Sequence, residues 1–166
     1  MDNDAWIRPF RPGDETAMLM IHGRSIQAIS ETVYTRAELD SWNFGKDVEG
    51  YLSAMASGEV YHVAVSQDEL AGFCGHKLHP DGWGEICGLY VDPGYQGRGL
   101  GKRLMANAEQ MMRAAGRWRI WIEASLAALS FYEAGGYRVV EELTHTTRGG
   151  LPLAMRRVEK VLGQGI

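Results

Sequence analysis

The chain has 166 residues, of which 45% are hydrophobic and 23% charged, as in an ordinary globular protein with a sizeable core. Seventeen basic and twenty-one acidic residues give a formal net charge of -4, which argues against nucleic acid as the main partner. No apolar run approaches the roughly 18 residues that a membrane span needs. The N-terminus is acidic and lacks a signal-like segment, so we expect one cytoplasmic domain over residues 1–166, with its core at about 5–160.

The hydrophobic period changes along the chain. Apolar residues recur at helical spacing before Gly58, whereas the middle is rich in β-formers separated by short turns. Thr35, followed by Glu38, has the capping-box pattern. In chain order we expect a strand over Trp6–Phe10; helices from Asp14 to Ile29, from Thr35, and from Lys46 to Met55; strands over Val60–Val65, Leu70–His76 and Gly84–Val91; a helix over Leu104–Ala115; a strand over Trp118–Glu123; a helix over Ala124–Ala134; and strands over Tyr137–Leu143 and Leu153–Val158. This order predicts an α/β or α+β sheet layered with helices.

A glycine-rich turn, residues 92–102, lies between a predicted strand and a predicted helix. This arrangement gathers backbone N–H groups around an anion, and the helix dipole adds positive potential. The turn therefore predicts a phosphorylated ligand. Its spacing argues against a P-loop, because Arg103 stands where that motif has Ser or Thr. It also argues against a dinucleotide fingerprint, because the glycines alternate as Gly-x-Gly-x-Gly.

Two motifs in this chain resemble those of one protein family. Gln96, Gly99 and Gly101 form Gln-x-x-Gly-x-Gly, which is similar to the acetyl-CoA pyrophosphate loop of the GNAT superfamily of N-acetyltransferases. Ser125–Tyr137 is similar to that family's Asn-x-x-Ala-x-x-Phe-Tyr-Glu-x-x-Gly-Phe motif, and the element order agrees from about Ile7 to Glu159. The resemblance implies a mixed, mostly antiparallel central sheet of six to seven strands flanked by helices on both faces.

The resemblance also implies where acetyl-CoA binds. Pantetheine would take the place of a pairing strand, with an N–H near Leu89 or Tyr90 donating to the thioester oxygen. The glycines would let the backbone approach the pyrophosphate and adopt positive φ. Ser125 replaces the family's asparagine, which leaves a cofactor contact there open. The implied donor-binding residues are Leu89, Tyr90, Val91, Gln96, Gly97, Arg98, Gly99, Gly101, Lys102, Ser125 and Tyr132.

Two side chains are candidates for proton transfer. Tyr132 matches the family's tyrosine, which would protonate the leaving CoA thiolate; the alternative for an aromatic near a helix end is simple packing. Glu85, eleven positions before Gln96, is the candidate base for the attacking ammonium. A water chain, Glu123, or a merely exposed role for Glu85 are the alternatives.

The acetyl acceptor is less well defined. We expect its site to include Tyr34, Trp42, His22 and His145. The histidines show no metal-ligand spacing, and Cys74 and Cys87 are expected to be small buried residues, so no metal is predicted. The sequence therefore predicts direct transfer of acetyl from acetyl-CoA to the primary amine of a small molecule, in a possible homodimer. Transfer to protein or peptide amines, and a catalytically silent acyl-CoA sensor, are the alternatives.

Overall fold

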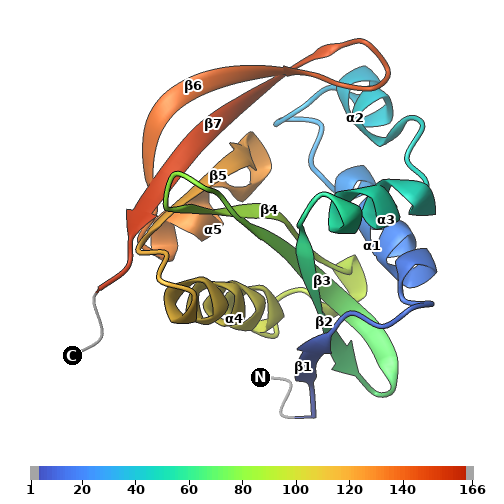
Figure 1. Cartoon of the computed structure of the whole chain (residues 1–166). Coiled ribbons are helices and arrows are strands. Elements are labelled where there is room, and N and C mark those ends of the chain that lie inside the picture. Colours follow the sequence, from blue (N-terminus) through green and yellow to red (C-terminus); the bar gives the residue numbers. More distant parts are fainter. Residues whose placement is uncertain (1–3, 164–166) are drawn as a thin grey trace.

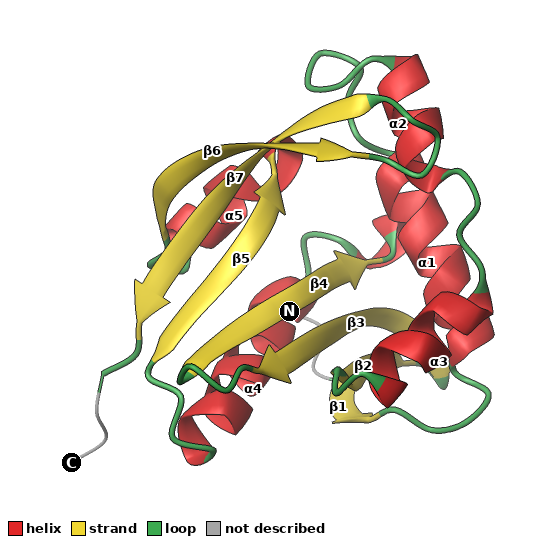
Figure 2. Cartoon of the chain, turned by 45° about the horizontal axis from the view of Figure 1, so that its top comes forward, coloured by secondary structure: helices red, strands yellow, loops and turns green. Residues whose placement is uncertain are grey.

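The computed structural model describes residues 4–163, whose strands form one seven-stranded sheet with helices on both faces (Figures 1 and 2). Across the sheet the order is β1-β2-β3-β4-β5-β7-β6, and β4–β5 is the parallel pair among antiparallel neighbours. The elements are β1 (Trp6–Pro9), α1 (Glu15–Gln27), α2 (Arg36–Asn43), α3 (Val48–Ala56), β2 (Val60–Ser66), β3 (Glu69–Leu78), β4 (Trp83–Val91), α4 (Leu100–Ala114), β5 (Arg119–Ser125), α5 (Leu129–Ala134), β6 (Arg138–Thr146) and β7 (Pro152–Val161). The predicted fold class is confirmed.

Each face of the sheet buries its own apolar cluster. On one face, Leu104 and Met112 of α4 pack with Ile86 and Ile120 of the sheet. On the other face, Met18 of α1 and Tyr51 of α3 pack with β-strand residues including Phe73. These two clusters fix α1 and α4 on opposite sides of β4 (Figure 2). Among the described residues, no helix is long and apolar enough to cross a membrane.

The local turn and cap signals agree closely with the structure. The two residues between β2 and β3, Gln67 and Asp68, have φ of 52° and 62°, as in a two-residue type I′ hairpin. The predicted capping box is confirmed: Glu38 N donates to Thr35 Oγ1, and Thr35 N donates to Glu38 Oε1. Asp14 stands at the start of α1 as predicted, but its carboxylate binds the Arg8 guanidinium at 2.8 Å instead of capping the helix.

Several predicted boundaries are wrong. The first helix ends at Gln27, short of Ile29, and the third begins at Val48, capped by Asp47. The largest error is the predicted helix over Ala124–Ala134. There β5 continues to Ser125, because it pairs with β7 up to Met155. A short 3₁₀ turn follows before α5 begins. The extension of β5 brings Ser125 to the site described below.

The parallel pair at the centre of the sheet is short. β4 and β5 pair only where Trp83–Glu85 lies beside Arg119–Trp121, and the two strands then part. The rest of β4 pairs with β3, and the rest of β5 pairs with β7. At the junction, a Cβ on Gly84 would lie 2.4 Å from Met112 Sδ, so α4 packs against bare backbone there. The sheet is therefore open in its middle beyond Glu85.

Candidate active site

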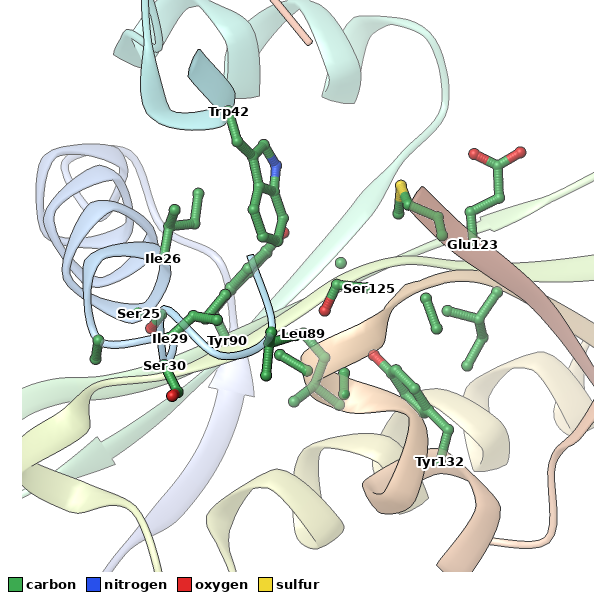
Figure 3. A pocket seen from close by; sticks show the side chains of 18 of the residues that line it. Ser25, Ile26, Ile29, Ser30, Trp42, Leu89, Tyr90, Glu123, Ser125 and Tyr132 are labelled. Carbon is green, nitrogen blue, oxygen red and sulfur yellow. The ribbon is translucent and has the colours of Figure 1, made fainter. Parts of the chain in front are cut away.

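A cavity of about 420 Å³ occupies the space between the parted strands (Figure 3). Cys87–Tyr90 of β4 and Ile122–Ser125 of β5 line its two walls. The end of α1, with the loop after it, and Trp42 of α2 cover one side, and Tyr132 of α5 lies on the other. Because the facing strand edges do not pair with each other, their backbone groups can bind an extended ligand in this cleft.

A β-bulge shapes the β4 wall. Gly75 of β3 lies opposite Gly88, and His76 lies opposite Ile86, so Cys87 is the extra residue. Such bulges bend a strand and re-aim its side chains, often beside active sites. Cys87 is partly exposed and lines the cleft, so the expectation that it is buried is wrong, whereas Cys74 is buried as predicted. Burial and the neighbouring Glu85 raise the pKa of the Cys87 thiol, which stays protonated at neutral pH.

A second cavity, of about 430 Å³, adjoins the cleft at Tyr132 and contains the glycine-rich turn. Gly97 and Gly99 have φ of +79° and +81°, and a Cβ on either would meet no atom within 4 Å. Gly99 is also the N-cap of α4 and has no side chain to cap the N–H groups of the first turn. An open cradle of backbone N–H groups at a helix N-terminus fits the pyrophosphate of acetyl-CoA. Gly101 differs from expectation: its φ is not positive, and a Cβ there would lie 3.3 Å from the Phe131 ring.

Side chains from α1 and from the turn hold the end of β4 in place. The carbonyl of Val91 accepts hydrogen bonds from Ser25 Oγ at 3.0 Å and from Gln96 Nε2 at 3.2 Å. Arg24 Nε donates to Asp92 Oδ2 at 2.8 Å. Gln96 therefore attaches the turn to its own strand, and α1 is attached to the same point.

The two basic side chains of the turn differ in their surroundings. The Arg98 guanidinium lies 5.1 Å from the centre of the Tyr95 ring and donates to Gly94 O at 3.4 Å. Lys102 is exposed and lines the cavity of the glycine turn. Lys102 is therefore placed to add positive charge to that cavity, while Arg98 packs against the turn itself.

Tyr132 lies where the two cavities meet. Its side chain points toward the part of the cleft between Leu89 and Ser125 (Figure 3). The ring packs edge-on against Phe131 and Tyr137, with centroids 5.2 and 5.8 Å away. The hydroxyl forms no hydrogen bond within residues 4–163. Burial raises the pKa of this phenol above its usual value, so it holds its proton at neutral pH.

Glu85 is the last residue of β4 that pairs with β5. Its Oε2 lies 2.7 Å from His79 Nε2. Burial raises the pKa of this carboxyl, with Glu59 and Glu123 adding to the rise and His79 opposing it. Glu59 and Glu123 thus both act on Glu85. Glu123 lines the cleft, whereas Glu85 is not among its lining residues. Sequence reasoning missed Glu59, which stands immediately before β2 and belongs to no motif.

The four residues predicted to line the acceptor site separate into two groups. Trp42 lines the cleft, and His22 lines a neighbouring cavity. Tyr34 is instead 2% exposed: its hydroxyl donates to Ala154 O at 2.6 Å and accepts from Leu126 N at 2.8 Å. This bonding places Tyr34 in the core. His145 is exposed on β6 and lines neither the cleft nor its neighbouring cavities.

The described residues hold no group of three or more His, Cys, Asp or Glu side chains arranged to bind a metal ion. The cleft instead offers strand edges, a protonated phenol and nearby carboxylates, together with the amide cradle of the glycine turn. These are groups that can bind a phosphorylated thioester and transfer protons.

Comparison with known proteins agrees with this geometry. The model of the acetyltransferase (GNAT) family matches residues 26–137. Mycothiol acetyltransferase from Saccharopolyspora erythraea is 34% identical over 137 residues, which cover 76% of this chain and 41% of that protein. The chain thus spans about two fifths of the length of that relative.

Solved structures extend the match over the whole fold. A GCN5-related N-acetyltransferase from Rhodopseudomonas palustris has a TM-score of 0.86 and 27% identity, covering 98% of both chains. The PaiA N-acetyltransferase from Thermoplasma acidophilum, solved in complex with coenzyme A, has a TM-score of 0.76 and 22% identity, covering 95% of this chain and 98% of its own. With the family model matched over both motifs and the open sheet, this chain belongs to the GNAT family of acetyltransferases.

Proposed function

We propose that this protein transfers an acetyl group from acetyl-CoA directly to the primary amine of a small molecule. The observation that carries the proposal is the continuity of the site: the amide cradle, the open strand edges and the Tyr132 hydroxyl lie along two adjoining cavities. A further cavity, of about 250 Å³, adjoins the cleft at Cys87. That volume is below the roughly 300–1,000 Å³ usual for small-molecule sites, which supports a small acceptor.

The chain's first task in this reaction is to position two substrates. The glycine turn would hold the pyrophosphate, and the free edge of β4 near Leu89 would bind the extended arm and donate an N–H to the thioester oxygen. Holding amine and thioester together supplies much of the rate, because a bimolecular step then proceeds within one complex.

The second task is to move protons. The amine nitrogen forms a bond to the carbonyl carbon, the carbon–sulfur bond breaks, and the sulfur leaves with the electron pair of that bond. Tyr132 would donate its phenolic proton to this sulfur. Glu85, directly or through a water molecule, would accept the proton that the amine loses. Burial suits both roles: it keeps the phenol of Tyr132 protonated, and it makes the carboxylate of Glu85 a stronger base.

An amine panel with detection of released thiol tests the proposal. We expect CoA release that depends on both acetyl-CoA and a small primary amine. Tight acetyl-CoA binding by calorimetry, with no amine-dependent release, would favour a silent acyl-CoA sensor. Release only with peptide or protein amines would favour the protein acceptor.

Glu85→Gln is expected to lower kcat/KM about tenfold at neutral pH, because the variant cannot accept the amine proton and water must do so. The pKa of Glu85 is raised, so the wild-type rate should fall as pH drops through that raised value. The variant should lack this fall of kcat/KM on the acidic side, which we call the acidic limb. The kcat/KM values of wild type and variant should therefore converge at low pH. The measurement is kcat/KM between about pH 5 and 9.

Glu123→Gln serves as the matched control, since it removes a carboxylate from the cleft wall without changing the residue at the strand junction. An acidic limb that persists unchanged in Glu85→Gln but disappears in Glu123→Gln would move the base to Glu123.

A further inference from the structure

The 250 Å³ cavity beside the cleft combines several segments of the chain. Residues from α1, α3, the start of β2 and Cys87 of β4 line it, together with Lys46 and Arg148 from two loops. Cys87 also lines the cleft, so this cavity begins where the cleft ends. An acceptor whose amine lies near Cys87 would extend into this space.

Two cations of this cavity lack an acidic partner. Lys46 is partly buried between α2 and α3, and it forms no hydrogen bond or ion pair within the part of the chain that the structure describes. Arg148, in the β6–β7 connection, donates a hydrogen bond to the carbonyl of Gly45. Burial and the nearby Arg148 both lower the pKa of Lys46. Lys46 is partly buried whereas Arg148 is exposed, and two neighbouring like charges repel each other unless an anion lies between them.

The loop that carries Arg148 is held in place. Thr147 Oγ1 and Ser41 Oγ of α2 are 2.5 Å apart and buried, and Gly149 N donates to Ser41 O at 3.1 Å. Arg148 lies between these two attachments, where the β6–β7 connection reaches α2 (Figure 1). Its place at the cavity is thus set before any ligand binds, which reduces the entropy lost on binding.

The acidic side chains at this cavity accept hydrogen bonds from neutral groups. Asp47 Oδ1 accepts from Gly50 N at 3.1 Å and caps α3, and Glu59 Oε2 accepts from Tyr61 Oη at 2.6 Å. Neither forms an ion pair with Lys46 or Arg148. Glu59 also raises the pKa values of Cys87 and Glu85, which places its negative charge at the Cys87 end. Glu59 therefore puts negative charge near Cys87, while Lys46 and Arg148 bring two unpaired cations to the same cavity.

A neutral polar group completes the lining. His22 Nδ1 lies 2.8 Å from Tyr51 Oη, and its Nε2 is buried with no hydrogen-bond partner among the described residues. Burial, with Lys46 nearby, lowers the pKa of His22 to about 3, so the ring is uncharged at neutral pH. The positive charge of the cavity therefore comes from Lys46 and Arg148.

We propose that the acceptor is an amine that also carries an anionic group, a carboxylate or a phosphate, bound between Lys46 and Arg148. Its ammonium group lies at the Cys87 end, near Glu59 and Glu85, and is directed into the cleft. The inference rests on the proposed acetyl transfer and specifies the class of acceptor for the same site.

Binding to the CoA-loaded protein tests this inference without requiring turnover. The probes are two pairs that differ in the anionic group: O-phosphoethanolamine against ethanolamine, and 4-aminobutanoate against 4-aminobutanamide. In wild type we expect the anionic member of at least one pair to bind about tenfold more tightly by calorimetry. Lys46→Met and Arg148→Met should each remove most of this difference and leave the neutral amines unaffected.

Arg113→Met, on the exposed face of α4, is the matched control and should keep the wild-type discrimination. Arg148→Glu should reverse the preference and favour the neutral amine. Equal affinity of wild type for both members of each pair, or discrimination that survives in Lys46→Met and Arg148→Met, would overturn the inference. Discrimination without acetyl transfer would leave the anion site standing and overturn the proposed function. Acetyl transfer to neutral amines, with equal affinity for the anionic and neutral members of each pair, would leave the proposed function standing and overturn the anion site.

Discussion

Tyr132→Phe is expected to lower kcat by about 100- to 1,000-fold, the lower part of the range usual for loss of a general acid. The leaving thiolate would then have to take its proton from water. Folding should be almost unaffected, because the hydroxyl has no hydrogen-bond partner in the described chain and the ring packing against Phe131 and Tyr137 is kept. Acetyl-CoA affinity should also stay close to wild type.

Thiol-release kinetics, calorimetry with acetyl-CoA and thermal unfolding measure the three quantities separately. Tyr137→Phe is the control, because it removes a neighbouring phenol outside the cleft. That hydroxyl donates to Glu109 Oε1 at 3.1 Å, so this control should lose stability but keep its turnover. If Tyr132→Phe retains turnover within about twofold of wild type, Tyr132 is a packing residue and the acid must be sought elsewhere.

Tyr34→Phe is expected to lower the free energy of unfolding by about 2 kcal/mol, because two backbone groups lose their shared partner. Tyr34 joins Ala154 of β7 to Leu126 in the turn after β5, so one hydroxyl connects the second half of the sheet to the loop before α2. For a chain of this size, the melting temperature should fall by about 4–8 °C. Urea unfolding and thermal unfolding both measure the change.

The acceptor KM separates the structural role of Tyr34 from a binding role. The core position predicts an acceptor KM and a kcat close to wild type at temperatures where the variant is folded. A tenfold rise in acceptor KM with unchanged stability would instead restore Tyr34 to the acceptor site, where the sequence had suggested it lay.

The parts of the fold that depend on neighbouring residues were predictable from the sequence. The capping box at Thr35 and the hairpin around Gln67 and Asp68 are determined by side chains a few residues apart. The glycine turn was predictable for the same reason, since its conformation depends on glycine at fixed spacing. The continuation of β5 to Ser125 was not, because alanine and leucine there favour a helix, and pairing with β7 overrides that preference.

The acceptor side of the site depends on residues that meet only in the folded chain. Lys46 and Arg148 are about a hundred positions apart in the sequence and come together because the β6–β7 connection is attached to α2. Neither belongs to a motif, so nothing in the sequence joined them. Tyr34 illustrates the opposite error, in which a core residue was assigned to the acceptor site. Nothing in the sequence around this tyrosine indicated that its hydroxyl would bond to a residue 120 positions away.

The parted strands also matter for how the protein avoids self-association. A strand edge without a partner is a template on which another polypeptide can pair, and natural sheets usually cover such edges. Here two of them face each other inside the sheet, between β4 and β5. The end of α1, Trp42 and the segment leading into α5 surround the opening between them. The fold thus places these two unpaired strand edges within the sheet, next to helices and loops, instead of at its rim.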